Sequence, residues 1–197
     1  MLRLVLNDEH ADAVLREALT ACRHRLLIAT ADVKDVHLPA GPVRSPGPRP
    51  AARSIVEVFD ELARRRVEVR LLHAGVPSGP LLGRLREHVP ATLTMRRCPR
   101  VHAKAVVADG RLMYLGSANL TGAGLGAKGP RRRNFEAGIW TDRLDLIDPV
   151  ADMLDTIWTG SQCPTCGRKT HCPAPLEEPD LRGSGVAALS LLRQPRI

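Results

Sequence analysis

The sequence predicts an α/β fold in which a mixed β-sheet is flanked by helices. Two observations carry this prediction. Helix-like apolar periodicity alternates with short buried strand patterns, and an Asp-Gly turn joins two strand-like runs near the middle of the chain. Alternating helix and strand patterns are typical of parallel crossover connections. With 197 residues, 44% of them hydrophobic, the chain can bury one sizeable core, or form one domain with an appendage.

The N-terminal half is predicted to contain two pairs of a helix followed by a strand. Apolar residues recur at helical spacing over 9–24 and again over 52–65, and buried strands follow at 26–33 and 67–72. The stretch 37–50 between the pairs contains five prolines, which cannot continue either element. We therefore expect a surface loop there.

The C-terminal half is predicted to contain a short helix, a strand, a central hairpin, another strand and a closing helix. These elements are expected at 81–88, 92–97, 101–124, 135–141 and 146–159. A cysteine cluster follows the last helix. We therefore expect an α/β domain over 1–160, and a small cysteine-rich appendage with a C-terminal tail over 161–197.

The composition points to an anionic partner. A formal net charge of +8 favours nucleic acid or an acidic membrane surface. Only four of the 29 basic residues are lysines, an excess of arginine that fits either phosphate binding or a GC-rich genome. The apolar run at 2–6 is too short for a signal peptide, and no later run is long enough to span a bilayer. We expect a cytoplasmic protein without membrane insertion.

The predicted hairpin at 101–124 carries polar residues in an otherwise apolar stretch. His102 and Lys104 alternate with apolar residues at the period of a β-strand, which puts both on one face. An Asp109-Gly110 turn then sends the chain back toward Ser117 and Asn119. The hairpin is therefore predicted to gather five polar side chains at one spot.

These residues resemble the signature of the phospholipase D superfamily, the HKD enzymes. The signature reads H-x-K-x4-D-x6-G-S-x-N, and its six positions are filled here by His102, Lys104, Asp109, Gly116, Ser117 and Asn119. The resemblance extends less specifically to the order of helices and strands over 9–159, and to Glu136 on the strand after the hairpin. It implies a phospholipase D-like mixed sheet flanked by helices, and it leaves the cysteine cluster outside.

The chemistry of these side chains suits phosphoryl transfer from a phosphodiester. His102 is the expected nucleophile, and Lys104 and Asn119 are the expected donors to the non-bridging oxygens. Glu136 is the expected acceptor that holds the other ring nitrogen of the imidazole. The resemblance implies a phosphohistidine route with two histidines, of which the second protonates the leaving oxygen and later activates water.

Three motif residues are expected to support the site. Asp109 is predicted to fix the turn through bonds to its own backbone. Gly116 is predicted to permit close backbone approach. Ser117 is expected to donate a supporting hydrogen bond to the groups that do the chemistry.

The chain contains one such motif, because none of its other six histidines has a lysine two residues later. Two-fold symmetry can complete the pair when the same patch from each subunit meets across an isologous interface. We therefore expect a homodimer whose active site contains His102, Lys104 and Asn119 from both chains.

The cysteines predict a structural zinc site and no catalytic metal. Cys163-Pro-Thr-Cys166-Gly has the form of a zinc knuckle, and Cys172 follows six residues later. Either Cys98 or His171 could supply the fourth ligand. Cys98 is preferred because it precedes the hairpin directly, whereas His171 adjoins Cys172 and would share the metal only in an awkward geometry. The alternative is a reduced cluster without metal.

The substrate is expected to be nucleic acid. Arg131, Arg132 and Arg133 precede Glu136 and could follow a phosphate backbone, although a solvated charge run explains them equally well. Aromatic residues make up only 3%, which argues against a base-stacking platform. Our first hypothesis is a nuclease, with DNA preferred, serving bacterial defence or repair with companion proteins. A phospholipase D or phosphatidyltransferase is the second, and an inactive nucleic-acid-binding subunit is the third.

Overall fold

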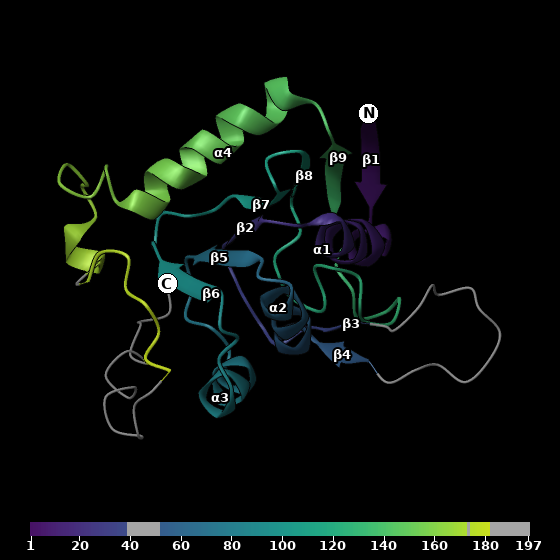
Figure 1. Ribbon diagram of the computed structural model, residues 1–197, viewed down its shortest axis with the longest axis horizontal. Coiled ribbons are helices and arrows are strands. Elements are labelled where there is room, and N and C mark those ends of the chain that lie inside the picture. Colours follow the sequence, from purple (N-terminus) through teal and green to yellow (C-terminus); the bar gives the residue numbers. More distant parts are fainter. Residues whose placement is uncertain (39–51, 173, 182–197) are drawn as a thin grey trace.

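The computed structural model describes residues 1–38, 52–172 and 174–181. Seven strands form one sheet in the order β1-β9-β8-β7-β2-β5-β6 (Figure 1). Their bounds are Leu2–Leu6 (β1), Arg25–Thr30 (β2), Glu68–His73 (β5), Leu93–Arg97 (β6), Lys104–Ala108 (β7), Leu112–Gly116 (β8) and Ala137–Thr141 (β9). The pairings β2–β5 and β5–β6 are parallel and the others are antiparallel, so the predicted mixed sheet with parallel crossovers is confirmed.

The helices occur where helical periodicity predicts them, with changed boundaries. They are η1 (Ala11–Glu17), a π-helix that continues into α1 (Ala18–Ala21), then α2 (Ile55–Arg64), α3 (Gly79–Glu87) and α4 (Leu144–Thr159). The short 3-10 helix η2 (Lys169–His171), in the cysteine-rich segment, is not predicted by the sequence. The helix α2 begins at Ile55 because residues 53 and 54 form the short strand β4. Ser54 then caps the helix by accepting a hydrogen bond from the Val56 amide at 3.2 Å.

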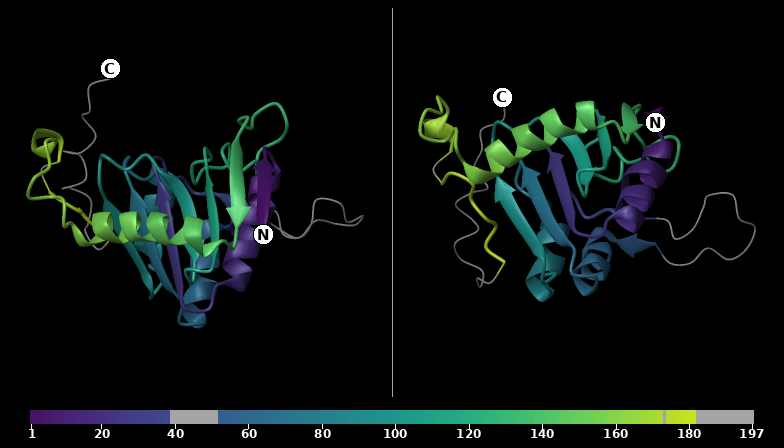
Figure 2. Two further views of the ribbon diagram at one scale, coloured as in Figure 1. Left: turned by 90° about the horizontal axis from the view of Figure 1, so that it is seen from above. Right: turned by 45° about the horizontal axis from the view of Figure 1, so that its top comes forward.

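Helices cover both faces of the sheet, which gives the domain two hydrophobic cores. One core joins a sheet face to η1, α1, α2 and α3, with Phe59 and Trp140 among its largest buried side chains. The other joins the opposite face to α4 through Ile147, Leu154 and Trp158. Figure 2 shows α4 running along one face of the sheet while α2 and α3 lie on the other.

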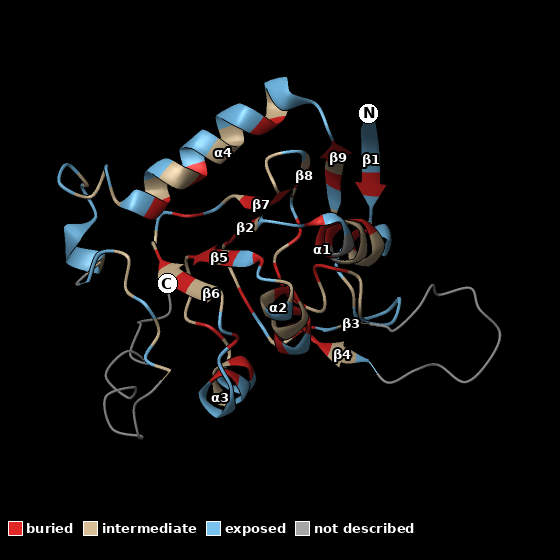
Figure 3. Ribbon diagram, viewed as in Figure 1, coloured by how far each residue is buried: buried red, intermediate tan, exposed pale blue. Residues whose placement is uncertain are grey.

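The strand β7 lies in the middle of the sheet, between β2 and β8, and all five of its residues are buried. Val106 and Ala108 belong to the core with α1 to α3, whereas Ala105 and Val107 belong to the core under α4. Figure 3 shows the resulting red colour of the central strands. The predicted alternation is confirmed, but the strand begins at Lys104, since residues 101–103 have no regular structure.

The apolar run Leu2–Leu6 forms an edge strand that the sequence pattern does not predict. It pairs antiparallel with β9, so Leu4 lies opposite Ile139. Val5 is buried, whereas Leu2 and Leu4 are 56% and 61% exposed. The partner strand lies at the far end of the domain in the sequence, and only tertiary folding brings the two together.

The C-terminal segment returns to the other edge of the sheet. Gly160 ends α4 with a φ of +76°, a left-handed conformation that favours glycine. Farther along, the Arg97 amide of β6 donates a hydrogen bond to the Glu177 carbonyl at 2.9 Å, and the two side chains form an ion pair at 3.3 Å. The appendage predicted to begin at residue 161 is therefore attached to β6.

Two further sequence-based expectations concern the proline-rich loop and membrane spans. Of the predicted proline-rich loop, His37 and Leu38 form strand β3, which pairs with β4 (Arg53–Ser54), and 39–51 lie outside the described residues. In the described part of the chain, every helix is too short or too polar to cross a bilayer.

Candidate active site

Five of the six motif residues lie at one edge of the sheet, next to the carboxyl end of the parallel strand β2. Lys104 begins β7 beside the end of β2, and it pairs with Gly116, the last residue of β8. Ser117 and Asn119 follow directly, so they leave the sheet at the same edge. The carboxyl edge of parallel strands is a common position for ligands in α/β folds.

His102 and Lys104 form the centre of this site. The Lys104 Nζ lies 3.2 Å from each ring nitrogen of His102, and it donates a hydrogen bond to the His102 carbonyl oxygen at 2.9 Å. The His102 side chain is exposed, whereas Lys104 is only 8% exposed. A substrate can therefore reach the imidazole from solvent, with the ammonium beside it.

The charge of Lys104 has no carboxylate partner among the residues that the structure describes. Its hydrogen bonds there all go to His102, and none of the ion pairs includes it. Burying an ammonium is unfavourable unless an anion or several hydrogen bonds compensate it. A phosphoryl group at this position would supply the missing negative charge.

Asn119 is held with its amide oriented. Its Oδ1 accepts hydrogen bonds from the backbone amides of Ala31 and Asp32, at 3.1 and 3.2 Å. The buried Thr30 strengthens this arrangement because its Oγ1 accepts a hydrogen bond from the Leu120 amide at 3.0 Å. With the oxygen engaged, the NH₂ group of Asn119 is the end left to donate to a substrate.

Residues 30–32, which hold Asn119, are not identified by the sequence analysis. Thr30 and Asp32 are polar residues at the end of a buried parallel strand, and this position is a signal that could have marked them. The apolar pattern over 26–33 predicts instead that they belong to one strand. The strand ends at Thr30, and the amides of the next two residues donate to the Asn119 side chain instead of to a neighbouring strand.

Ser117 and Glu136 form a second polar pair at the same edge. The Ser117 hydroxyl donates a hydrogen bond to Glu136 Oε2, and the Asn134 side-chain amide donates one to Oε1 at 3.0 Å. No hydrogen bond joins Glu136 to His102 within the described ranges, so the orienting role of Glu136 stays a prediction. The supporting hydrogen bond expected of Ser117 goes to this carboxylate.

The glycine of the motif is needed because strands approach closely there. A Cβ atom added to Gly116 would lie 2.7 Å from the Ala137 carbonyl oxygen and 2.7 Å from the Gly138 Cα. Real Cβ atoms do not approach backbone so closely, and the expected role of Gly116 is confirmed. The close approach keeps Ser117 in contact with the first residue of β9, because the Ser117 amide donates a hydrogen bond to the Ala137 carbonyl at 3.0 Å. Glu136 directly precedes β9, which corrects the expectation that it lies on the strand.

Asp109 lies at the opposite end of β7 from Lys104, away from the other motif residues. Its carboxylate accepts hydrogen bonds from the backbone amides of Arg23, His24 and Arg25, at 2.7 to 2.8 Å. Asp109 therefore fixes the start of β2, and the expectation that it bonds to the backbone of its own turn is wrong. The expectation that all five polar side chains of the hairpin gather at one spot is also wrong, because Asp109 lies apart from the other four. Burial acts to raise the pKa of Asp109, but these amide hydrogen bonds outweigh it and lower the pKa.

The three arginines lie on the loop that leads to Glu136. Arg131 and Arg132 are exposed, whereas Arg133 is partly buried and forms an ion pair with Asp8 at 2.9 Å. Phe135, on the same loop, is 96% exposed. Two of the three predicted substrate-binding arginines are thus exposed, the third is engaged with the N-terminal segment, and their role in substrate binding stays a prediction.

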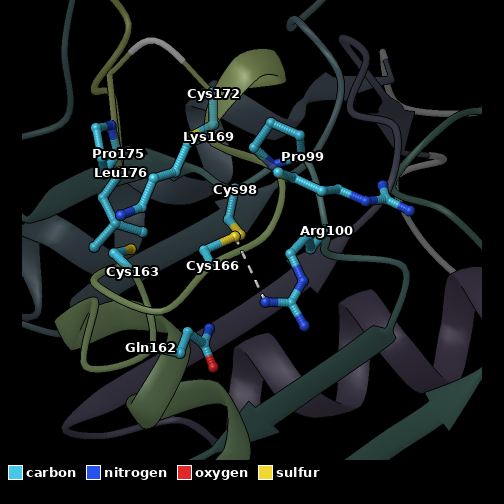
Figure 4. Close-up of a pocket in the computed structure, with 11 residues that line it drawn as sticks. Cys98, Pro99, Arg100, Gln162, Cys163, Cys166, Lys169, Cys172, Pro175 and Leu176 are labelled. Carbon is cyan, nitrogen blue, oxygen red and sulfur yellow. Dashed lines mark hydrogen bonds between the residues drawn. The ribbon is translucent and has the colours of Figure 1, made fainter.

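The predicted zinc ligands line one pocket, to which neither His102 nor Lys104 contributes. Cys98, Cys163, Cys166 and Cys172 all contribute to its wall (Figure 4). No group of three or more His, Cys, Asp or Glu side chains in the described residues is already arranged to hold a metal ion. The cluster is thus brought together by the fold, and its metal content stays a prediction.

Comparisons with known proteins agree with this architecture. Residues 15–158 match the family model described as cardiolipin synthase, PLD-like domain. The structure of NucT from Helicobacter pylori is 15% identical, with a TM-score of 0.57 over 81% of this chain and 96% of that chain. Nuc from Salmonella typhimurium, a phospholipase D family member, is 13% identical, with a TM-score of 0.56 over 81% of this chain and 94% of that chain.

The comparison with curated proteins gives no match. At these identities the two solved structures show a shared fold, and the family model carries the assignment because it spans most of the chain, including every residue of the hairpin motif. The chain therefore belongs to the phospholipase D superfamily, a superfamily of phosphodiesterases, as a protein with a PLD-like domain.

Proposed function

We propose that this protein is a phosphodiesterase that cleaves nucleic acid, preferentially DNA, with His102 as the nucleophile. The observation that carries the proposal is the buried Lys104 ammonium, which lies 3.2 Å from both ring nitrogens of an exposed histidine and has no carboxylate partner in the described part of the chain. Such a pair presents a nucleophile and a positive charge to the same incoming group.

The proposed reaction begins when a ring nitrogen of His102 attacks the phosphorus. An N–P bond forms and the bond from phosphorus to the leaving oxygen breaks, which gives a phosphohistidine. Lys104 and the Asn119 amide bind the non-bridging oxygens, where negative charge develops as phosphorus becomes five-coordinate. The fixed orientation of Asn119 means that its donor does not have to reorganise during the reaction.

A second acid–base group is needed to complete the cycle. The leaving oxygen takes up a proton, and a water molecule must then be deprotonated to attack the phosphohistidine. We assign this role to His102 of a second copy, because the sequence contains one H-x-K motif and the imidazole is open to solvent. The site is therefore proposed to lie between two identical subunits.

Charge supports nucleic acid as the substrate. The formal net charge is +8, and exposed Arg131 and Arg132 lie on the loop that leads to the site. Each arginine that neutralises a phosphate releases counterions and adds affinity without sequence preference. Phe135 adds a single exposed ring, on which an unpaired base could stack. A setting in bacterial defence or repair, with companion proteins, is part of the same proposal.

The test is to incubate the purified protein, in parallel, with labelled single-stranded DNA, double-stranded DNA, RNA and phosphatidylcholine vesicles. We expect cleavage of DNA by the wild type and none by His102→Ala. Cleavage of lipid alone would replace the proposal with a phospholipase, and DNA binding without turnover would indicate a binding subunit. A quench in alkaline detergent, in which the N–P bond of a phosphohistidine is stable, should trap the labelled phosphoryl group on His102 and identify the nucleophile directly.

A further inference from the structure

We propose that Cys98, Cys163, Cys166 and Cys172 bind one structural zinc ion that ties the C-terminal segment to the loop carrying His102. The four side chains come from two places in the sequence, one directly after β6 and three after α4. They nevertheless line a single cavity of about 30 Å³, large enough for an ion (Figure 4). This site is separate from the proposed active site, so it can be tested independently of the proposed function.

The local backbone around Cys163 and Cys166 has features of a metal-binding knuckle. The Cys166 amide donates a hydrogen bond to the Cys163 carbonyl at 3.2 Å, which closes a tight turn between the two cysteines. The Cys163 amide in turn donates a hydrogen bond to the Gly160 carbonyl at 2.8 Å, so the turn follows α4 directly. Two cysteines on a tight turn of this kind can bind one zinc ion as thiolates.

The positive charges around the cavity fit a thiolate cluster. Arg100, Arg168 and Lys169 line it together with the cysteines, and its lining includes no Asp or Glu from the described residues. The Arg100 Nη1 lies 3.6 Å from the Cys166 sulfur. Since a zinc ion with four thiolates carries a net negative charge, these cations stabilise the loaded site.

The structure favours Cys98 over His171 as the fourth ligand. Cys98 lines the cavity, whereas His171 is exposed, is not part of the lining, and has its Nδ1 3.0 Å from the Thr170 hydroxyl. Four thiolates form a closed tetrahedral shell that leaves no position for water. The proposed ion is therefore structural.

Zinc binding has to draw the sulfurs closer together, because no set of described side chains is arranged for a metal as it stands. The segment 161–172 consists of turns with partly or fully exposed side chains, so it can adjust more readily than Cys98. Cys98 is held on the sheet side because its amide donates a hydrogen bond to the His73 carbonyl at 2.8 Å. Metal binding would thus pull the turn segment toward the fixed residue.

The position of Cys98 links the ion to the active site. Val101 donates its amide hydrogen to the Cys98 carbonyl at 2.9 Å, and His102 follows immediately. The short stretch from Cys98 to His102 has no regular structure of its own. A metal bound at Cys98 would restrict this stretch, and Glu177 would hold the returning chain on β6 from the other side.

The experiment is to express the full chain in zinc-supplemented medium, purify it under reducing conditions without chelator, and measure zinc by atomic absorption. We expect one zinc ion per chain. Cys98→Ser and Cys166→Ser should each lose most of the zinc and lower Tm by at least about 5 °C, because metal binding is coupled to folding. Substitution of cobalt for zinc should give the thiolate-to-cobalt absorption of a tetrahedral site, a readout that does not depend on activity.

The fifth cysteine provides the matched control. Cys22 is fully buried in the core that η1, α1, α2 and α3 share with the sheet, and it does not line the cavity. Cys22→Ala should therefore retain one zinc ion per chain even if it lowers Tm. His171→Ala should also retain it. Loss of zinc from His171→Ala but not from Cys98→Ser would overturn this ligand set. The proposal would be overturned if the purified protein contained no zinc and also failed to bind cobalt. A disulfide between Cys163 and Cys166 would overturn it as well.

Discussion

The two ends of β7 carry residues of the same motif but use them in different ways. At one end, His102 is exposed and the Lys104 ammonium has hydrogen bonds only to His102 among the described residues. At the other end, Asp109 accepts hydrogen bonds from three successive backbone amides at 2.7 to 2.8 Å. One end retains capacity to bind a substrate, whereas the carboxylate at the other is occupied by the protein itself.

This difference separates chemistry from stability within one sequence signature. A residue whose hydrogen bonds are already satisfied by backbone contributes to folding, and its loss should appear in the free energy of unfolding. A residue held in place but left unsatisfied is free to act on a substrate, and its loss should appear in kcat. Substitutions at the two ends of β7 should therefore separate a loss of kcat from a loss of folding stability.

The largest effect is expected from His102→Ala. Removing the proposed nucleophile should lower kcat by at least about 10⁴-fold. The free energy of unfolding should change by less than about 0.5 kcal/mol, because the side chain is exposed. Steady-state kinetics and urea unfolding measure the two quantities. His88→Ala, at the exposed end of α3, is the matched control and should leave kcat unchanged.

The same variant tests the shared active site. Mixed dimers of His102→Ala and wild type should be inactive, or should stop at the phosphohistidine, because one of the two histidine roles is missing. Light scattering with activity measured across the same elution peak gives the oligomeric state of the active species. An active monomer would contradict the arrangement between two subunits.

Lys104→Met should lower kcat by about 10² to 10³-fold, as expected when one group that stabilises the transition state is lost. The folded protein should be at least as stable as wild type, since methionine is similar in length and removes a buried ammonium without a carboxylate partner in the described residues. Kinetics and thermal unfolding of the same preparation provide both values. A variant with kcat within tenfold of wild type would mean that Lys104 does not contact the phosphoryl group.

Asp109→Ala should reverse this pattern. It leaves three backbone amides without their acceptor, and we expect a loss of about 2–3 kcal/mol in the free energy of unfolding. The kcat of the folded fraction should stay within about threefold of wild type, because the opposite end of β7 is untouched. Asp12→Ala removes an exposed ion pair with Arg16 and should cost less than about 1 kcal/mol as a control.

The pH dependence of stability gives an independent measure of Asp109. Its pKa is lowered in the folded protein, so its contribution is present above the pKa of the unfolded chain and is lost as pH falls through the lower folded value. Asp109→Asn should therefore reduce the fall in the free energy of unfolding as pH decreases on the acid side. Near neutral pH it should lower this free energy by an amount that does not depend on pH. An unchanged acid side, measured by urea unfolding from pH 7 to pH 2, would contradict the role assigned to the carboxylate.

A smaller effect is expected from the double variant Arg131→Ala, Arg132→Ala. DNA affinity should fall, and the slope of log affinity against log salt should become less steep by about one for each phosphate that the variant no longer neutralises. Fluorescence anisotropy across a salt series measures this slope. Arg64→Ala, Arg86→Ala removes two exposed arginines from helices α2 and α3, and it should leave the slope nearly unchanged.

The smallest effect is expected from brief EDTA treatment, which should leave activity largely unchanged. In the proposed mechanism, Lys104 and Asn119 provide the charge stabilisation that a divalent cation gives to metal-dependent nucleases, and the proposed zinc ion has no open coordination position. The measurement compares turnover before EDTA, after EDTA and after magnesium is restored. If EDTA abolished activity and magnesium alone restored it, the reaction would depend on a metal ion. The proposal that His102 is the nucleophile would then be wrong.

The sequence by itself determined the elements of the sheet and the identity of the motif. Apolar periodicity located the four main helices and six of the seven sheet strands, because a buried face imposes its period on the chain locally. The spacing of His102, Lys104 and Asn119 alone predicted that they lie close together, since a hairpin with a short turn has a fixed register. The cysteine spacing likewise indicated which side chains the fold would bring to one cavity.

Only the tertiary structure decided what each motif residue contacts. The amides that hold Asp109 and those that hold Asn119 lie more than eighty positions earlier in the chain, so no local pattern could reveal them. The edge strand β1 depends in the same way on pairing with β9, at the other end of the domain. The local periodicity of apolar residues indicates which side chains are buried. The hydrogen-bond partners across the sheet depend instead on the order of the strands in space.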